Sequence, residues 1–398
     1  MNRDKILENN SSRLASLDIL RGFDLFLLVF FQPVFVALGQ QLDLPFLNRL
    51  VYQFDHEAWV GFHLWDLVMP LFLFMTGASM PFSLSKYKIS SAGCQFVYHR
   101  IFRRVVLLFL FGMIVQGNLL GFDSQHIYLY SNTLQAIAVG YLIAAIIQLH
   151  FSFKWQIIIT LLLLLVYWIP MTFCGDFTPQ GNFAEQVDRW VLGRFRDGVY
   201  WNGDGTWSFS LQYNYTWIWS SLTFGVTVML GTFAGKLMKE GEANRKRVVR
   251  ILLITGLILI GVAVLWSLQM PVIKRLWTGS MTLLSGGYCF LLMAFFYYWI
   301  DYKGRIWGLN WLKIYGMNSI AAYLLGEVIN FRCVAASVSY GLEQYLGDYY
   351  QVWLTFANYL ILFFILYRFN FIRIIHPKQS SGKCAGFPES HQHTIMNL

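Results

Sequence analysis

Charged side chains are scarce in this sequence. Only 13% of its 398 residues are Asp, Glu, Lys or Arg, against roughly 25% in an ordinary soluble domain. Hydrophobic residues make up 57% of the chain, and 18% of all residues are aromatic. Such a chain cannot cover a surface that faces water, so most of its surface has to face lipid. The composition therefore excludes a soluble enzyme and predicts an integral membrane protein.

Cysteine is also sparse, with five residues and no CxxC pair. An odd number of scattered thiols supports neither a metal site nor a disulfide framework. Cys174 and Cys333 can face the same compartment, and we leave a bridge between them open. A clear internal repeat is missing as well, which argues against the duplicated architecture of many secondary transporters.

Apolar runs of about 20 residues, enough for a helix to cross a hydrocarbon core of about 30 Å, recur along the chain. We find ten, near residues 17–39, 62–85, 100–120, 132–150, 154–173, 214–236, 249–271, 280–300, 312–331 and 350–370. We therefore expect an all-α polytopic membrane protein with one transmembrane domain over residues 1–377. The polar segment 378–398 is predicted to be a disordered tail.

Basic residues are distributed unevenly between the two sides of these spans. With ten spans both termini lie on one side, and that side carries 23 of the 30 Lys and Arg residues. By the positive-inside rule the termini are cytoplasmic, so the net charge of +9 marks orientation in the bilayer and does not indicate a nucleic-acid partner. On the opposite side, residues 174–213 are expected to form a folded, substrate-facing extracytoplasmic loop.

Ionisable residues inside the spans each cost about 2.5–3.5 kcal/mol on insertion scales, so each needs a partner or a purpose. Arg21 can pair with Asp18 on one helix face. Gln32 follows Arg21 by eleven residues, or about three turns, so we expect both on one face that can line a path across the membrane.

A second group of polar residues follows the helical period near the carboxyl end. Ser319, Tyr323, Glu327 and Asn330 lie at offsets of 0, 4, 8 and 11 and form one polar stripe. The stripe is typical either of a substrate site or of hydrogen bonds between helices.

The segment 54–80 holds a candidate for acid–base chemistry. His56 precedes the second span among aromatic residues, where burial can keep the imidazole neutral, the form that a general base or an acyl acceptor needs. Asp66, in the first turns of that span, can orient an imidazole or pair structurally. Arg100, Arg103 and Arg104 stand at the cytoplasmic end of the third span, where guanidiniums can bind phosphates or anchor the topology.

Six segments together resemble a known family. They are RLASLDILRG (13–22), HEAWVGFHLWDLVMPLFLFMTG (56–77), TLQAIAVGY (133–141), AEQVDRWVLG (184–193), PVIKRLWTGS (271–280) and GMNSIAAY with Glu327 (316–327). In this order they resemble the transmembrane acyltransferases typified by heparan-α-glucosaminide N-acetyltransferase and its bacterial homologues, over nearly the whole chain.

The resemblance implies transfer of an acetyl group from cytoplasmic acetyl-CoA to the amine of a glucosamine-type sugar or a glycosaminoglycan-derived saccharide on the extracytoplasmic side, without a metal. It also implies an integral protein of a bacterial inner membrane, and we leave open whether two copies form a homodimer. The alternatives are a sugar O-acyltransferase and, less favoured, a secondary transporter.

Residue by residue, His56 matches the family's catalytic histidine, with Asp66 and Gln32 as further catalytic candidates. Gln32 stands where the family often has Asn, and Gly326 stands where a second histidine occurs in a relative. The remaining candidates are Arg21, Arg100, Arg103, Arg104 and Gln135 for acetyl-CoA, and Asn318, Ser319, Tyr323, Glu327, Lys274 and Trp277 for the saccharide. His56 can serve as a base in a ternary complex, which we favour, or can itself carry the acetyl group.

Overall fold

The computed structural model describes residues 14–84, 94–213 and 215–375. Its helices are α2 (Ala15–Phe26), α3 (Gln32–Leu42), α4 (Pro45–Tyr52), α5 (Val68–Leu84), α6 (Cys94–Val115), α7 (Thr133–His150), α8 (Phe153–Phe173), α9 (Phe183–Leu192), α10 (Ser221–Glu240), α11 (Arg245–Trp266), α12 (Gly279–Phe296), α13 (Asn310–Met317), α14 (Ser319–Val328), α15 (Arg332–Ser339), α16 (Glu343–Leu346) and α17 (Tyr350–Ile375). Strands β1 (Val199–Trp201) and β2 (Trp207–Phe209) form an antiparallel hairpin. The expected all-α polytopic membrane architecture is confirmed.

The number of spans differs from the expectation of ten. Among the described residues, eight helical stretches are long and apolar enough to cross a membrane. The expected span 312–331 is divided into α13 and α14 by a break at Asn318, whose side chain donates to the Ile314 carbonyl. The expected span 100–120 is α6, a 22-residue helix that is not one of the eight and that carries three arginines in its first half. Polar residues inside these two segments explain both differences.

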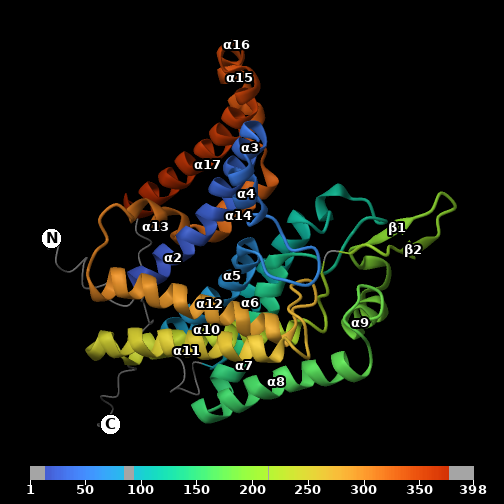
Figure 1. The fold of residues 1–398 in the computed structure, drawn as a ribbon, viewed down its shortest axis with the longest axis vertical. Helices are drawn as coiled ribbons and strands as arrows, with labels where there is room; N and C mark the ends of the chain where they lie inside the picture. Colours follow the sequence, from blue (N-terminus) through green and yellow to red (C-terminus); the bar gives the residue numbers. More distant parts are fainter. Residues whose placement is uncertain (1–13, 85–93, 214, 376–398) are drawn as a thin grey trace, which may run out of the picture.

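The helices form a bundle around α10. In Figure 1, α10, α11 and α12 lie side by side, and α5, α6 and α7 lie together in the middle of the bundle. Helix α10 packs on α5, α7, α8, α11 and α12. In contrast, α8 and α11 present large exposed apolar side chains, including Leu161, Leu162 and Leu165 on α8 and Leu257 and Ile258 on α11. These two helices therefore have the surface expected next to lipid.

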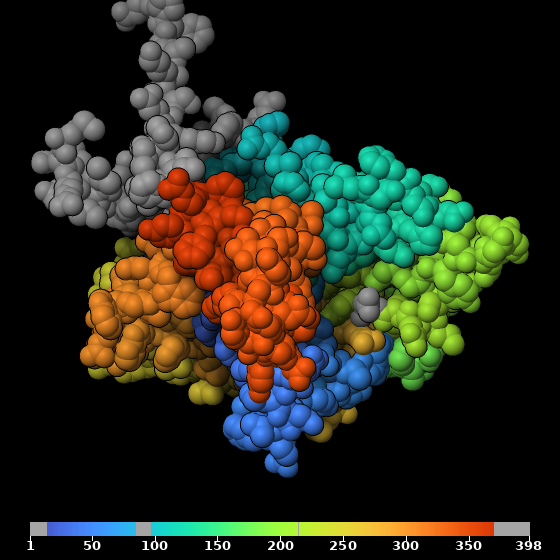
Figure 2. Space-filling model, turned by 90° about the horizontal axis from the view of Figure 1, so that it is seen from above, coloured from blue at the N-terminus to red at the C-terminus, as the bar shows by residue number. Residues whose placement is uncertain are grey.

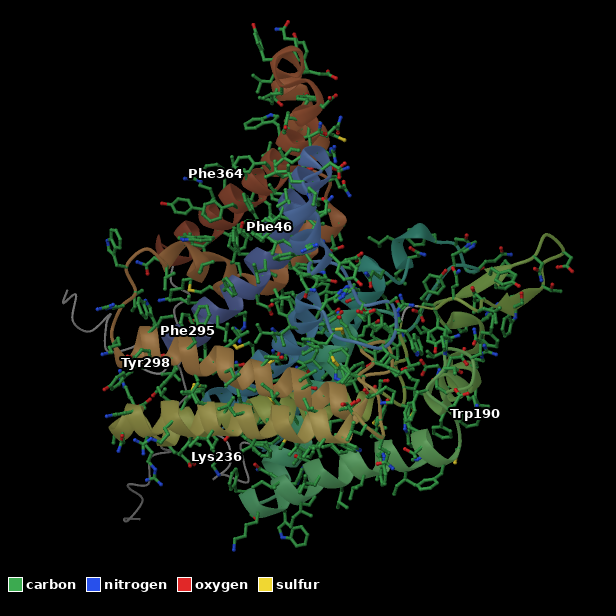
Figure 3. The ribbon with its side chains drawn as sticks, in the orientation of Figure 1. Phe46, Trp190, Lys236, Phe295, Tyr298 and Phe364 are labelled. Atoms are coloured by element: carbon green, nitrogen blue, oxygen red, sulfur yellow. The ribbon has the colours of Figure 1, made fainter. Side chains whose placement is uncertain are left out.

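The two ends of the bundle differ in character. Lys236, close to the α10–α11 connector, and Trp190 of α9 lie at opposite ends (Figure 3). The α9 end also carries the β1–β2 hairpin (Figure 1), and both α9 and the hairpin belong to the segment 174–213, for which an extracytoplasmic position stays a prediction. Cys174 and Cys333 are both free thiols, so the bridge left open between them is absent. The expected polar tail lies outside the described residues.

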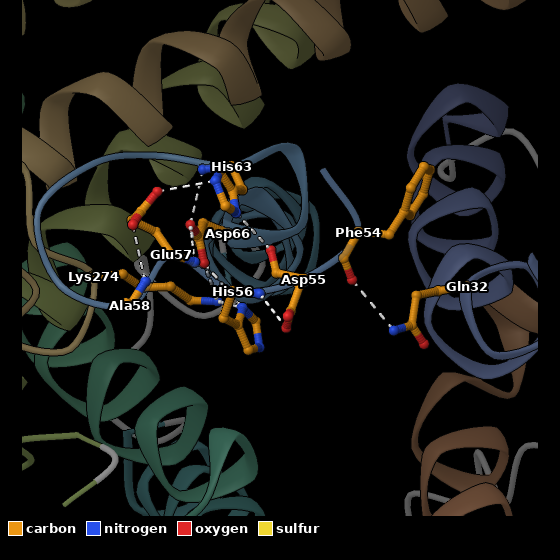
Figure 4. A network of polar contacts seen from close by, with 9 residues as sticks. All are labelled: Gln32, Phe54, Asp55, His56, Glu57, Ala58, His63, Asp66 and Lys274. Atoms are coloured by element: carbon orange, nitrogen blue, oxygen red, sulfur yellow. Dashed lines mark hydrogen bonds and ion pairs between the residues drawn. The ribbon is translucent and has the colours of Figure 1, made fainter. Parts of the chain in front are cut away.

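A π-helical turn interrupts the first span. It occupies Leu27–Phe31 between α2 and α3, and its wider bonding pattern changes the angular position of every residue that follows. Arg21 lines the central cavity described below, whereas Gln32 does not and instead donates from Nε2 to the Phe54 carbonyl at 3.3 Å (Figure 4). Of the two residues expected to line one path, only Arg21 therefore lines the cavity.

Glycines allow the central helices to approach closely. A Cβ atom at Gly77 of α5 would lie 1.8 Å from the Val228 carbonyl oxygen of α10, and one at Gly231 would lie 1.9 Å from the Phe74 carbonyl oxygen. No side chain fits at these distances, so α5 and α10 touch backbone to backbone. Contacts of this kind are typical of helix packing in membranes, where small residues replace the hydrophobic driving force.

We predict that Gly77→Ala destabilises the fold, because the new methyl group forces α5 away from α10 at a cost of about 1–3 kcal/mol. Gly261→Ala on α11 is the matched control, since a Cβ atom at Gly261 would have nothing within 4 Å. That change should be neutral or stabilising because alanine favours a helix. Melting temperatures of the purified proteins in detergent check this, and equal melting curves for the two variants would contradict the close packing.

Candidate active site

A cavity of about 860 Å³ lies among the helices. It is lined by side chains of α2, α5, α6, α7 and α14 and of the loops at their ends. Val68 and Thr76 of α5 both line it, and eight residues of helix correspond to about 12 Å along the axis. In the view of Figure 2, the surface dips between the orange C-terminal segments and the teal and green segments. A cavity of this volume can hold a cofactor-sized ligand.

His56 stands on the loop between α4 and the 3₁₀ turn that starts α5. Its Nδ1 lies 2.9 Å from Oδ1 of Asp66 (Figure 4). The imidazole is 45% exposed and lines the cavity, so the expectation that it is buried among aromatic residues is wrong. Phe54 packs on Phe31 and Trp65 instead. With Nδ1 directed at Asp66, Nε2 is the nitrogen left to meet a ligand.

The Asp66 carboxylate is buried and holds the loop together. Its Oδ2 accepts the main-chain N–H groups of His63 at 2.9 Å and of Glu57 at 3.3 Å. Its Oδ1 faces His56 and Lys274. A buried carboxylate needs this many donors, because each unpaired oxygen would carry the full cost of desolvation. Asp66 therefore fixes both the position of the imidazole and the path of the loop from residue 56 to 63.

Lys274 joins this pair from the loop between α11 and α12. Its Nζ lies 3.2 Å from Asp66 Oδ1 and 3.0 Å from His56 Nδ1, and its side chain is 5% exposed. Burial lowers the pKa of Lys274 to about 8, against the opposing attraction of Asp66. When Nδ1–H of His56 donates to Asp66, the Lys274 ammonium donates to the same carboxylate oxygen. Sequence analysis proposed Lys274 as a saccharide-binding residue and did not predict its contact with His56.

Trp277, the other candidate from this loop, does not line the cavity. It is 1% exposed and donates from Nε1 to Thr227 Oγ1 at 3.2 Å. Its φ of 52° places it in the left-handed region, which lets the loop turn sharply before α12. Trp277 thus anchors the loop that carries Lys274.

The arginines divide into two groups. Arg21 and Arg104 line the cavity, and the Arg104 guanidinium lies 4.3 Å from the centre of the Tyr141 ring. Arg100 and Arg103 are exposed on α6 and do not line it. Arg21 of α2 and Arg104 of α6 lie well inside their helices, away from the loop of His56. The cavity therefore has the guanidiniums of Arg21 and Arg104 in one part and the His56 cluster in another.

Gln135 is buried and caps the start of α7. Its Oε1 accepts the main-chain N–H groups of Ser131 and Asn132, and its Nε2 donates to the Leu129 carbonyl at 2.6 Å. Gln135 does not line the cavity, although Ser131 does. Its contacts are those of a residue that positions the cavity wall.

The polar stripe of α14 does face the cavity. Ser319, Tyr323 and Glu327 all line it, and Tyr323 accepts a hydrogen bond from Asn132 Nδ2 at 3.4 Å. Asn318 instead occupies the break between α13 and α14 and is not a lining residue. Asn330, the last member of the expected stripe, lies beyond the end of α14, is exposed and does not line the cavity. The stripe therefore contributes a polar wall between the two ends of the cavity.

Two buried aspartates connect the 174–213 segment to this site. Asp188 of α9 accepts the main-chain N–H groups of Trp217 and Ile218 at 2.7 and 2.8 Å. Burial raises the pKa of Asp188 to about 7 and that of Asp197, which lines the cavity, to about 6. The nearby Arg196 guanidinium opposes both shifts.

Sequence reasoning missed several residues at the His56 end of the cavity. Glu57, Asp197 and Arg275 line it, and His63 contacts Glu57. The segment HEAWVGFH did contain a signal, because one carboxylate and two imidazoles within eight residues are unusual beside an apolar span. Asp197 and Arg275 come from distant loops, and only the fold brings them here.

The fold and this cavity define the class of the protein as a polytopic helical membrane protein with a polar internal site. A family model described as "Heparan-alpha-glucosaminide N-acetyltransferase, catalytic" matches residues 13–184, which include His56 and Asp66. These matches, with the relatives below, confirm the resemblance to that family of transmembrane acyltransferases.

Two curated relatives are similar over most of the chain. Heparan-alpha-glucosaminide N-acetyltransferase of Homo sapiens is 26% identical over 371 residues, covering 79% of this chain and 53% of the relative. The protein of the same name from Mus musculus is 24% identical over 376 residues, covering 81% and 54%. The chain thus spans about half the length of the curated relatives it matches.

We predict that Lys274 gives the protein a measurable dependence of stability on pH. Its pKa is about 8 in the folded chain against an ordinary value of 10.5, so the unfolded chain binds more protons between these values. The contribution of Lys274 to the free energy of unfolding therefore rises with pH from about 8 to 10.5. Melting temperatures across this range should show the rise, and Lys274→Met should remove it while Lys154→Met, at an exposed site, should not. Parallel curves for all three proteins would contradict the buried ammonium.

Proposed function

We propose that this chain is an integral membrane acyltransferase that moves an acetyl group from cytoplasmic acetyl-CoA to the amine of a glucosamine-type saccharide on the extracytoplasmic side. The observation that carries the proposal is the half-exposed imidazole of His56. It is held by Asp66 and faces a cavity that also contains the guanidiniums of Arg21 and Arg104. The names of the matched relatives support the same reaction class.

In the proposed reaction the saccharide amine attacks the thioester carbonyl carbon of acetyl-CoA. His56 Nε2 takes a proton from the attacking nitrogen, while Nδ1–H donates to Asp66 and keeps the lone pair on Nε2. The carbon–sulfur bond then breaks, and the imidazolium returns its proton to the leaving thiolate. Amide and free thiol are the products, and no metal takes part.

Asp66 and Lys274 have opposite electrostatic effects on the charged form of His56. When His56 becomes an imidazolium, the Asp66 carboxylate at 2.9 Å stabilises the new charge, and the Lys274 ammonium at 3.0 Å opposes it. An imidazolium that is stabilised only in part gives up its proton to the leaving group more readily. Lys274 is therefore proposed as a positioning residue, and a role for it in saccharide binding is not needed.

The donor is proposed to bind with its phosphates at Arg21 and Arg104, which lie in the part of the cavity away from His56. The distribution of basic residues supports the proposed direction of the chain in the bilayer, with the termini in the cytoplasm. The cytoplasmic origin of acetyl-CoA is part of the proposal. Location in a bacterial inner membrane, a homodimeric state and the remaining saccharide contacts stay predictions.

We predict that His56→Ala lowers kcat for acetyl transfer by roughly 10²–10⁴, the usual contribution of general-base catalysis, with an unchanged KM for acetyl-CoA. Purified protein with acetyl-CoA and a panel of amino and hydroxyl sugars provides the assay. His126→Ala, at an exposed imidazole outside the cavity, is the control. Near-normal turnover by His56→Ala would remove this residue from the chemistry, and transfer only to hydroxyl sugars would make the protein an O-acyltransferase.

The same preparation separates the two mechanisms. Incubation of wild-type protein with radiolabelled acetyl-CoA and no saccharide should leave no stable label on the protein if transfer is direct. Stoichiometric label on the wild type and none on His56→Ala would instead establish an acetyl-imidazole intermediate.

We predict that replacing both Arg21 and Arg104 with Gln raises the KM for acetyl-CoA by about 10- to 100-fold and leaves that for the saccharide nearly constant. Charge-assisted hydrogen bonds of about 1.5–3 kcal/mol are lost on one substrate only. Arg103→Gln is the matched control, because this arginine is exposed on the same helix and does not line the cavity. Equal effects on both substrates would rule out phosphate binding as the role of these arginines.

A further inference from the structure

A second pairing of carboxylate and imidazole lies next to His56. His63 Nε2 is 2.9 Å from Glu57 Oε2, and the two side chains are 7% and 22% exposed (Figure 4). Glu57 lines the same cavity as His56 and is its neighbour in the chain. The reaction proposed above uses neither Glu57 nor His63.

The Glu57 carboxylate is held in place by its surroundings. Oε1 accepts the main-chain N–H of Ala58 at 3.0 Å, and Oε2 faces His63. Gly61 has a φ of 142°, and a Cβ atom there would lie 3.0 Å from Oε2. A side chain at residue 61 would displace the carboxylate, so the backbone is shaped to admit it. Two of its roughly four acceptor positions remain for a ligand in the cavity.

The partners of His63 indicate that this pair has a place for one proton. Its Nδ1 lies 3.1 Å from the Asp55 carbonyl oxygen, which can only accept a hydrogen bond. Nδ1 therefore carries a hydrogen, and Nε2 meets a carboxylate that also accepts. The contact at Nε2 is favourable only when one further proton lies between the two groups. The pair is neutral with that proton and carries one negative charge without it.

The proposed acetyl transfer requires such a group. At neutral pH a primary amine of this kind is mostly an ammonium ion, with an ordinary pKa of about 7.7–8.0. An ammonium has no lone pair and must lose one proton before it can attack, and the attacking nitrogen loses a second proton when the amide forms. His56 can take only one proton in each cycle and returns it to the thiolate, so one proton needs another acceptor.

We propose that Glu57, with His63 behind it, binds the acceptor amine as its ammonium and takes the first proton, and that His56 takes the second. This inference rests on the proposed acetyl transfer and adds a catalytic residue to it. The step starts from the pair without its extra proton: the ammonium N–H bond breaks, the proton passes to Glu57 Oε2 and is shared with His63 Nε2, and the neutral amine attacks. The 2.9 Å contact between Oε2 and Nε2 corresponds to the state that holds this proton. The proton then leaves to solvent through the exposed edge of Glu57, which accounts for the one proton released per turnover.

The other charged or titratable groups at this end of the cavity are His56, Asp66, Lys274, Arg275, Asp197 and Tyr215. Asp66 is occupied by Lys274 and His56, and burial raises the pKa of Asp197 to about 6. The Asp55 carboxylate accepts the main-chain N–H of His56 and does not line the cavity. Glu57 is therefore the cavity-lining carboxylate next to the catalytic imidazole that has a proton partner.

The experiment compares two acceptors that differ in amine basicity. One is a glucosamine-type sugar, and the other is the same sugar with an aminooxy group, which is uncharged at pH 7. For Glu57→Gln we expect kcat/KM at pH 7 to fall by roughly 10- to 100-fold with the ammonium-forming sugar and to change little with the aminooxy sugar. The loss should shrink as pH rises above about 8, where the amine is already neutral.

Two further variants complete the test. His63→Gln keeps an N–H donor toward Glu57 but cannot hold the extra proton, so it should show the same selective loss. Asp123→Asn is the matched control, because Asp123 and His126 form an exposed pair at 2.6 Å that does not line the cavity. An unchanged KM for acetyl-CoA verifies that each variant is folded.

Equal losses of Glu57→Gln on both acceptors at all pH values, or no loss on either, would overturn the assignment of Glu57 and leave the acetyl-transfer proposal standing. Wild-type protein that acetylates neither sugar would overturn both proposals. If Glu57→Gln does not fold, the same comparison of the two acceptor sugars is made with His63→Gln, and equal losses on both sugars would overturn the assignment.

Discussion

The buried carboxylate of Asp66 is the interaction on which the site depends. A carboxylate at the start of a membrane helix has to be neutralised and fully hydrogen bonded, or its desolvation would cost several kcal/mol. Asp66 meets this need with the Lys274 ammonium, the His56 imidazole and the main-chain N–H groups of Glu57 and His63. Two loops that are far apart in the sequence are thereby joined. The same contacts that position the His56 imidazole also offset the cost of burying the Asp66 carboxylate.

A polar cavity inside a bilayer sets a second constraint. The helices around it must pack together without the hydrophobic driving force that water provides for soluble proteins. Here the closure comes from direct backbone contact. Gly77 and Gly231 join α5 to α10, and Gly22 and Gly316 do the same between α2 and α13, where a Cβ atom would lie 1.8 or 1.9 Å from a carbonyl oxygen. Helices held this closely form a rigid frame, so the polar side chains that face the cavity are fixed by helices that cannot easily move apart.

The sequence predicted the fold where one physical rule dominates. Twenty apolar residues have few alternatives to a membrane helix, and the run at 132–150 became α7, Thr133–His150. The sequence did not predict features that depend on local packing, such as the π turn of Leu27–Phe31 and the contact of Gln32 with the Phe54 carbonyl that follows it. His56 and Asp66 could be paired because they are neighbours in sequence. Lys274 could not, because only the closure of the α11–α12 loop on Asp66 brings it there.

The two ends of the cavity are built differently. Arg21 and Arg104 stand on helices whose positions are fixed by close packing, whereas His56, Glu57 and Lys274 stand on loops. Loops accept changes of sequence more readily than helices in a packed core. A fixed end suits a donor of constant structure such as acetyl-CoA, and a loop-built end can be adapted to different acceptors. In the proposed reaction the acceptor amine contacts groups of the segment His56–His63, so a few substitutions there would alter which amines bind and leave the proposed donor end unchanged.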